Sequence, residues 1–402
     1  MVNQLRYVDL FAGCGGISLG LYKAGLAGLF AIEQNSDAFS TLQHNLIDRN
    51  AHFDWPSWLS LANWNVNDLL NSHYSELTTL RGTVDLVVGG PPCQGFSVAG
   101  QRLATDKRNS LIHSYLEFVE IVQPLVILFE NVRGFTLKFS NPNRHNKISY
   151  SEIVIKKLIE MGYTDARGEM INFAEYGVPQ KRERFLVIAT RERLSSDIFA
   201  ALEGNRANFC VSRNISVPVN SRSALSDLEK KHGTTRCPDS SRFLYGITSQ
   251  QQTDIQQLLR LPEEVNYVPD SHRFVNHTPA IQKIFEMLLQ KAPRNRTIKG
   301  EERELYGFKK RSLMVLDPDE PTPTITTIPD DFVHYSEPRV MTVRECARLQ
   351  TFPDWFEFEG PYTTGNKERA RQVPRYTQVG NAVPPLFAEQ LGIAMKRVLS
   401  RD

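Results

Sequence analysis

The sequence lacks the features that mark membrane-spanning and exported chains. It contains no run of about 18 apolar residues, so no transmembrane helix is expected. Its first residues, MVNQLRYVDLF, have neither the charged region nor the long apolar region of a signal peptide. Hydrophobic residues make up 41% and charged residues 23% of the 402 positions. This is the composition of a soluble globular protein, and a cytoplasmic location without a membrane partner is expected.

Cysteine is scarce and scattered along the chain. No two of the five cysteines form a CxxC pair, so no metal site is expected, and a disulfide framework is not expected in an intracellular chain of this size. Each cysteine is expected to be a small buried apolar residue unless its neighbours indicate reactivity. The cysteines are Cys14, Cys93, Cys210, Cys237 and Cys346.

The net charge is only +2 and says little about binding partners, but its distribution is uneven. Between positions 291 and 311, eight basic residues stand against three acidic ones, a local excess of five. Such a stretch can contact phosphate groups, or it can be an ordinary solvated surface.

The first 190 residues alternate between strand-like and helix-like patterns. This alternation predicts an α/β fold with a doubly wound, mostly parallel sheet that is covered on both faces, similar to a Rossmann fold. The expected helices are 17–24, 110–122 and 153–161, and the expected strands are 7–11, 29–33, 85–88, 125–130 and 184–189.

After residue 190 this rhythm ends, and the chain becomes polar and irregular. A T-x-x-E capping box at 342–345 predicts the start of a helix that Pro353 closes. Three domains are expected: 1–190, then 191–367 with the 342–352 helix, and a segment 368–402 that returns to the first domain. Further helices are expected at 253–261, 279–290 and 385–399.

A glycine-rich loop, residues 11–16, follows the first expected strand and leads into a helix. Gly13, Gly15 and Gly16 allow a ligand to approach the backbone at the carboxyl edge of the sheet. Glu33 lies twenty residues beyond Gly13, at the end of the next expected strand, where a carboxylate can bind ribose hydroxyls. The pattern predicts a nucleoside-containing cofactor, either S-adenosylmethionine or a dinucleotide, with a purely structural turn as the alternative.

The third expected strand, 85–88, leads into the segment GGPPCQGFS at 89–97. Pro91 and Pro92 stiffen the backbone directly before Cys93, at the edge of the sheet where ligands bind. This rigid presentation indicates that Cys93 is a nucleophile rather than an inert buried thiol.

Charged residues follow on the next two expected strands. Glu130 ends the strand 125–130 and would face the same pocket as Cys93 if the two strands are neighbours. Alternation would place Gln180, Arg182 and Arg184 on one face of a strand, where the arginines could bind an anion or form salt bridges with carboxylates.

Taken together, these segments resemble the DNA cytosine-5 methyltransferase family of prokaryotic restriction-modification systems. Six motifs match in the order of the family and reach both ends of the chain. They are DLFAGCGG at 9–16, GGPPCQGFS at 89–97, ENV at 130–132, QKRER at 180–184, RECARLQ at 344–350 and QVGNAVPP at 378–385.

The resemblance implies a site for S-adenosyl-L-methionine. Glu33 would hold the ribose, and Phe11 and Asp68 would contact the adenine. One departure stands at Gln34, where many relatives carry an aromatic residue. The full set of cofactor-binding residues implied in this way is Phe11, Gly13, Gly15, Gly16, Glu33, Asp68, Pro91, Leu111 and Asn381.

The implied chemistry begins with addition of Cys93 to C6 of cytosine, which makes C5 nucleophilic. Glu130 would bind N3, Arg182 would hold the O2 side, and Arg184 would orient Glu130 or the loop. The cytosine must be flipped out of the duplex to be reached, and residues 94–108 would form a loop that closes over it. The base that removes the C5 proton is not identified, and water can serve.

The resemblance also implies that residues 191–341 recognise double-stranded DNA. It implies a monomeric enzyme, with a cognate restriction endonuclease as a separate protein. A tRNA cytosine-5 methyltransferase on the same scaffold is the second hypothesis. Its Cys-Phe-Thr hallmark is missing, because Cys210 is followed by Val-Ser and Cys237 by Pro-Asp. A DNA-binding regulator with an inactive site is the third, and the intact motifs argue against it.

Overall fold

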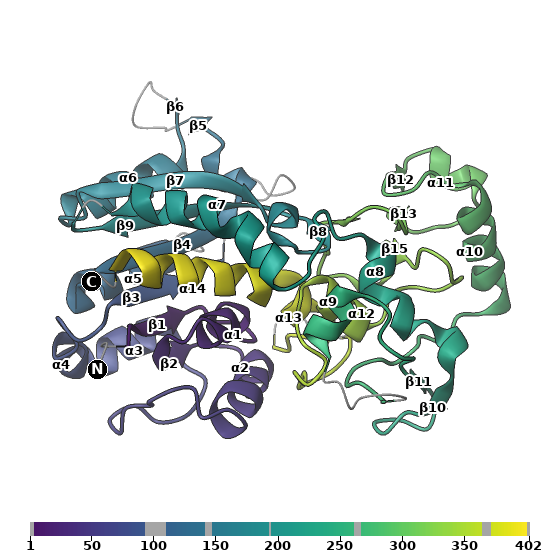
Figure 1. Cartoon of the computed structure of the whole chain (residues 1–402), viewed down its shortest axis with the longest axis horizontal. Helices are drawn as coiled ribbons and strands as arrows, with labels where there is room; N and C mark the ends of the chain where they lie inside the picture. The colour runs from purple at the N-terminus through teal and green to yellow at the C-terminus, as the bar shows by residue number, and fades with distance from the viewer. Residues whose placement is uncertain are drawn as a thin grey trace. The chain divides into compact units, whose positions relative to one another are not determined.

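The computed structural model describes residues 4–92, 110–140, 147–192, 194–260, 267–363 and 371–399. The chain forms two compact units (Figure 1). Unit 1 consists of Met1–Asn172, Glu183–Arg206 and Ala388–Asp402, and unit 2 of Phe173–Arg182 and Ala207–Phe387. No helix in these described ranges is long and apolar enough to cross a membrane.

Unit 1 is built on a six-stranded sheet with the order β2-β1-β3-β4-β9-β7. The first four of these strands are parallel, whereas β9 runs antiparallel to both β4 and β7. The strands are β1 (Arg6–Leu10), β2 (Ala27–Ile32), β3 (Leu86–Gly89), β4 (Val126–Val132), β7 (Asp165–Asn172) and β9 (Glu183–Thr190), and a separate hairpin pairs β5 (Phe139–Ser140) with β6 (Lys147–Ile148).

The expected α/β fold with a mostly parallel sheet is confirmed. The five expected strands are all present, within a few residues of their expected bounds. Strand β7 and the antiparallel direction of β9 were not predicted. Both depend on a hairpin-like return of the chain after β7, and the apolar pattern of a strand does not encode its direction.

The helices of unit 1 cover the sheet. The helix α5 occupies the residues expected for it, and α6 begins three residues earlier than expected, at a capping box in which Ser149 and Glu152 bond each other's backbone N–H groups. The helices are α1 (Gly16–Lys23), α2 (Ser36–Leu42) with a π-helical continuation Gln43–Asp48, α3 (Val66–Ser72), α4 (Tyr74–Thr78), α5 (Ser110–Val122), α6 (Tyr150–Glu160), most of α7 (Ser195–Ser212) and most of α14 (Pro385–Leu399).

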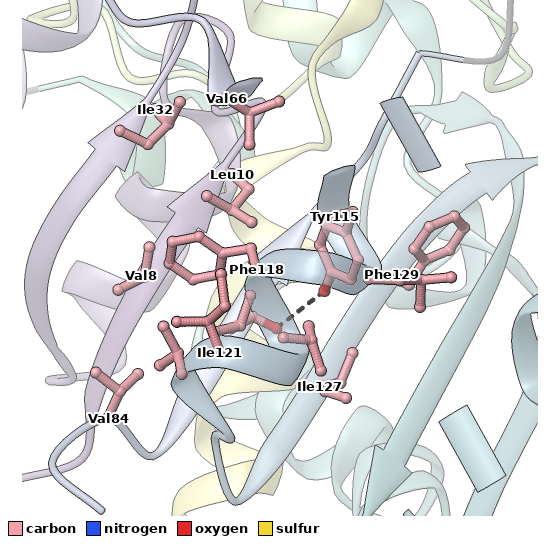
Figure 2. Packing of buried hydrophobic residues seen from close by; sticks show 14 of the residues in the cluster. Val8, Leu10, Ile32, Val66, Val84, Tyr115, Phe118, Ile121, Ile127 and Phe129 are labelled. Carbon is pink, nitrogen blue, oxygen red and sulfur yellow. Dashed lines mark hydrogen bonds between the residues drawn. The ribbon is translucent and has the colours of Figure 1, made fainter. Parts of the chain in front are cut away.

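Alternate residues of each strand form the main core on one face of the sheet. Val8 and Leu10 of β1 point to the same side as Ile127 and Phe129 of β4, as the period of two in a strand requires. Figure 2 shows these side chains packed with Tyr115, Phe118 and Ile121 of α5. The Tyr115 hydroxyl lies within hydrogen-bond distance of the carbonyl oxygens of Val87 (3.2 Å) and Leu128 (3.0 Å), so the helix is also fixed to β3 and β4 by a polar contact.

The C-terminal helix α14 packs beside α1 within unit 1 (Figure 1). A Cβ on Gly392 would lie 2.7 Å from the Cβ of Ala24, so the two helices approach at a point where only glycine fits. The Lys396 ammonium group donates a hydrogen bond of 2.9 Å to the Ala24 carbonyl oxygen. Residues far apart in the sequence are thus joined around the first strand.

Unit 2 contains short strands and helices rather than one large sheet. Its strands are β8 (Gln180–Lys181), β10 (Thr234–Arg236), β11 (Leu244–Gly246), β12 (Thr297–Lys299), β13 (Ser312–Val315), β14 (Thr322–Pro323) and β15 (Phe332–Val333). Its helices are α8 (Ser221–Leu225), α9 (Asp254–Leu259), α10 (Pro279–Lys291), α11 (Glu302–Leu305), α12 (Val343–Leu349) and α13 (Arg375–Asn381).

Buried ion pairs around α12 organise unit 2. The predicted capping box is present, since Thr342 accepts from the Glu345 amide while Glu345 accepts from the Thr342 amide. Arg348, with no exposed surface on its side chain, pairs with Asp227 at 3.1 Å and with Asp354 at 2.5 Å. A buried charge must be neutralised in this way, so the arginines of the RECARLQ segment serve the folding of unit 2.

The units differ in their limits from the expected domains 1–190, 191–367 and 368–402. Helix α7 keeps the chain with unit 1 until Arg206, and the return from unit 2 occurs at Ala388, inside α14. Residues 173–182 belong to unit 2 because β8 pairs with β14 rather than with the large sheet. No change in composition marks this short segment, which lies in the sequence between the neighbouring strands β7 and β9.

Candidate active site

Three parallel strands of unit 1 end in one row across the sheet, and the fourth, β4, crosses this row at Phe129. Leu10 pairs with Ile32 on one side and with Gly89 on the other, and Gly89 pairs with Phe129. The residues that follow this row are Phe11, Glu33, Gly90 and Glu130. Segments that are up to about 120 positions apart in the chain are therefore brought to a single edge, which is the edge where open α/β sheets bind their ligands.

The loop after β1 has the backbone that its glycines predict. Phe11, Gly13 and Gly15 all have positive φ, at 60°, 57° and 90°. No heavy atom lies within 4 Å of the position that a Cβ would take on Gly13, so open space borders this residue. Phe11 is half-buried and packs against the main core, and Gly16 is the first residue of α1.

Glu33 is tied to this loop by its carboxylate. One oxygen accepts from the backbone N–H of Gly13 at 3.0 Å, and the other accepts from the N–H of Asn35 at 2.7 Å. Burial raises the pKa of Glu33, while these two amides oppose the shift. The carboxylate thus sets the position of the glycine loop as well as lying at the end of β2.

Gln34, the departure from the family pattern, makes polar contacts in place of an aromatic surface. Its side-chain oxygen accepts a hydrogen bond of 2.9 Å from the Asn65 amide, and Asn65 caps the N-terminus of α3. The Trp64 N–H donates to the Glu33 carbonyl oxygen at 2.9 Å. These contacts fix the start of α3, with the exposed Asp68 in its first turn, to the end of β2.

Leu111 lies in the first turn of α5, half-buried against the main core. In the next turn, the Ser114 hydroxyl donates a hydrogen bond of 2.5 Å to the side-chain oxygen of Asn67, so α5 and α3 are joined at this end. Sequence reasoning did not identify Trp64, Asn65 or Ser114, because their partners are contacts between segments without a motif.

The segment before Cys93 lies against the end of β4. A Cβ on Gly90 would be 2.8 Å from Oε2 of Glu130, and a Cβ on Gly89 would be 2.4 Å from the Leu10 carbonyl oxygen. The Asn131 amide donates to the Pro91 carbonyl oxygen at 3.4 Å, and Pro91 is buried. Close packing therefore requires the two glycines, and the segment GGPP packs against Glu130 and Asn131 of the segment EN. Cys93 and the loop 94–108 lie outside the described residues.

Glu130 is held by an arginine of the neighbouring strand. The Arg184 Nε lies 2.9 Å from Oε1 of Glu130, and both side chains are only 13% exposed. Burial lowers the pKa of Arg184, and the adjacent Glu130 carboxylate opposes this shift. The pair leaves Oε2 of Glu130 directed toward Gly90. Arg184 is thus placed to orient Glu130.

The alternation predicted that Gln180, Arg182 and Arg184 share one face of a strand, and this prediction is wrong. The strand is interrupted at Arg182, so Gln180 lies in β8 of unit 2 and Arg184 in β9 of unit 1. The buried guanidinium of Arg182 donates to the Gly380 carbonyl oxygen at 3.0 Å and lies 3.5 Å from that of Asn381. Asn381 ends α13 of unit 2 with its side chain exposed.

The basic stretch 291–311 divides into structural and exposed residues. Arg294 donates to the carbonyl oxygens of Leu289, Leu316 and Tyr335, all within 3.0 Å, so it holds the fold of unit 2. Arg296 pairs with Glu302, and Lys310 with Asp331. Within the described ranges, the exposed residues of this stretch without an ion pair include Lys299, Lys309 and Arg311.

Asp9 lies beneath the glycine loop as a fully buried carboxyl group. Ser18 of α1 donates a hydrogen bond of 2.6 Å to its Oδ2, while its Oδ1 has no hydrogen-bond partner among the described residues. Burial raises the pKa of Asp9 to about 7, with the Ser18 hydrogen bond opposing the shift and the Glu33 charge adding to it. The strand that leads into the glycine loop therefore contains a carboxyl group whose pKa is raised to about 7.

We predict that Asp9→Asn changes the pH dependence of stability. In the wild type the raised pKa favours folding below about pH 4, and this contribution is lost as the pH rises through about 7. The variant should therefore gain melting temperature relative to the wild type between pH 5 and pH 8. Asp48→Asn, which removes an exposed carboxylate, is the control. An Asp9→Asn difference that stays constant over this range would contradict the assignment.

Comparison with known proteins agrees with this geometry. The mostly parallel sheet, with a glycine loop after its first strand and a carboxylate after its second, places the chain among the Rossmann-like α/β folds. The model of the C-5 cytosine-specific DNA methylase family matches residues 5–397. The chain therefore belongs to the C-5 cytosine-specific DNA methylases and is a DNA cytosine-5 methyltransferase.

Individual relatives cover nearly the whole chain. It is 30% identical to the type II methyltransferase M.Eco47II of Escherichia coli, over 99% of this chain and 80% of that protein. It is also 30% identical to M.PspPI of a Psychrobacter strain, over 98% and 79%. A prophage-encoded DNA modification methyltransferase from E. coli has the same fold, with a TM-score of 0.66, 24% identity, and coverage of 99% of this chain and all of that one.

Proposed function

We propose that the protein transfers a methyl group from S-adenosyl-L-methionine to C5 of a cytosine that is flipped out of a specific double-stranded DNA sequence. The reaction proceeds through a covalent bond between Cys93 and C6 of the base. The observation that supports this most is the row of strand ends, which sets the glycine loop, the segment before Cys93, and Glu130 at one edge of the sheet.

S-adenosyl-L-methionine supplies the methyl group. The open space beside Gly13 and the carboxylate of Glu33 fit a nucleoside, because a ligand can approach the backbone of the loop while its ribose hydroxyls donate to an acceptor. Asp68 is exposed in the first turn of α3 and suits the adenine amine. Phe11, Gly15, Gly16, Pro91 and Leu111 complete this set of cofactor-binding residues, and the family motif QVGNAVPP adds Asn381 to it.

The Cys93 thiolate adds to C6 of the cytosine, and C5 becomes the carbon that accepts the methyl group. Glu130 hydrogen-bonds N3 of the ring and stabilises the charge that addition creates, while Arg184 orients Glu130. The O2 role that the resemblance implies for Arg182 is not retained, because its buried guanidinium donates to backbone carbonyl oxygens within unit 2. Loss of the C5 proton, with water as acceptor, then allows Cys93 to leave and restores the aromatic ring.

DNA is the substrate, and a base in its duplex must leave the stack before Cys93 can reach C6. Recognition of the sequence belongs to residues 191–341, with Lys299, Lys309 and Arg311 as phosphate contacts. The relatives are named type II methyltransferases, which supports a restriction-modification role. The enzyme then acts as a monomer, and a cognate endonuclease cuts separately.

We predict that Cys93→Ser lowers methyl transfer by several orders of magnitude while cofactor binding persists, because serine is a far weaker nucleophile. Tritium transfer from labelled cofactor into DNA measures the activity. Cys237→Ser, which alters a buried cysteine of unit 2, is the control and should retain activity. Activity of Cys93→Ser within about tenfold of the wild type would refute the proposed nucleophile.

S-adenosyl-L-methionine should raise the melting temperature, and Glu33→Ala should reduce this shift. Ligand at about 100 times its dissociation constant contributes roughly 2.7 kcal/mol of stability to the folded state. Glu160→Ala, which removes an exposed carboxylate of α6, should leave the shift unchanged. The cofactor assignment fails if NAD, rather than S-adenosyl-L-methionine, stabilises the protein.

A further inference from the structure

Arg273 of unit 2 lies on a short backbone extension of the hairpin β10–β11. Its backbone forms an antiparallel bridge with Tyr245 of β11. On either side, Gly246 donates to the His272 carbonyl oxygen and Phe274 donates to that of Leu244, each at 2.9 Å. His272 and Phe274 are buried, so strand alternation places Arg273 on the opposite face, where its side chain is half-exposed.

Two aromatic rings hold the guanidinium group of Arg273. Its Cζ lies 3.5 Å from the ring centroid of Tyr362 and 4.3 Å from that of Phe243. Arginine stacks well on aromatic faces because its guanidinium is planar and weakly hydrated. Stacking uses the faces of the group and leaves the N–H donors at its edge available.

The nearby carboxylates are engaged with other groups. Asp239 accepts from the hydroxyls of Tyr245 and Tyr362, at 3.2 and 3.1 Å. Asp270 lies 3.3 Å from the Nη1 of Arg375. In the described part of the chain, the guanidinium of Arg273 forms no ion pair or hydrogen bond. An oriented cation with unused donors, half-exposed in unit 2, is suited to bind an external acceptor.

We propose that Arg273 reads a guanine of the recognition sequence by donating two hydrogen bonds to its O6 and N7 in the major groove. This inference rests on the proposed function. Paired acceptors on one base edge match the planar fork of arginine, and such a bidentate contact distinguishes guanine from the other bases. Among the described residues, Lys299, Lys309 and Arg311 have no comparable ring contacts, which suits them to phosphates, where orientation matters less.

The test begins with the recognition sequence of the wild type, found by bisulfite sequencing of a methylated plasmid library. Arg273→Ala and Arg273→Lys should then accept other bases at one guanine position, with a loss of discrimination of roughly 5- to 150-fold in kcat/KM at that position. Lysine keeps the charge but loses the fork. Arg242→Ala, at an exposed arginine of the same hairpin, should leave discrimination unchanged.

A second arm uses the wild type alone. Replacing each guanine of the site by 7-deazaguanine removes N7, and one position should lose activity by a similar factor. Arg273→Ala should be insensitive to that replacement. The inference is overturned if no guanine depends on N7, or if Arg273 variants lose activity equally on all sequences. Absence of 5-methylcytosine with the wild type would instead refute the proposed function.

Discussion

The site depends on the alignment of four parallel strands, three of which end in the same row. Ile32, Leu10, Gly89 and Phe129 form one row across the sheet, and the glycine loop, Glu33, the segment before Cys93, and Glu130 follow it directly. Close packing maintains the row, because a Cβ on Gly89 would lie 2.4 Å from the Leu10 carbonyl oxygen and one on Gly90 would lie 2.8 Å from Oε2 of Glu130. Glu130 and the glycine loop of the proposed site therefore lie along one edge of the same sheet.

Polar contacts convert this alignment into a defined site. Glu33 bonds the Gly13 amide and thereby fixes the glycine loop, while Arg184 fixes Glu130 from the antiparallel strand β9. The contact between Arg184 and Glu130 depends on the antiparallel pairing of β9 with β4. A parallel β9 would not place Arg184 beside Glu130 in this register. The same side chains can then serve as ligands and as supports, which is the condition for a preorganised active site.

The sequence allowed much of unit 1 to be predicted and less of the rest. Apolar runs separated by amphipathic helices indicated the parallel strands, and a glycine loop with Glu33 twenty residues later indicated a nucleoside site. The proximity of Gly90 to Glu130, the bond between Gln34 and Asn65, and the separation of Arg182 from Arg184 depend on pairings between distant segments. Local periodicity carries no information about such pairings, so only the structure reveals them.

The central claim is that the edge carrying Glu130 receives the cytosine that Cys93 attacks. A crystal structure of the enzyme trapped on duplex DNA with 5-fluorocytosine at the target position tests it directly, because fluorine at C5 blocks release of the adduct. The account predicts a bond between the Cys93 sulfur and C6, Oε2 of Glu130 within about 3 Å of N3, and Arg184 still paired with Oε1. A trapped base bonded to another residue, or one with N3 turned away from Glu130, would contradict it.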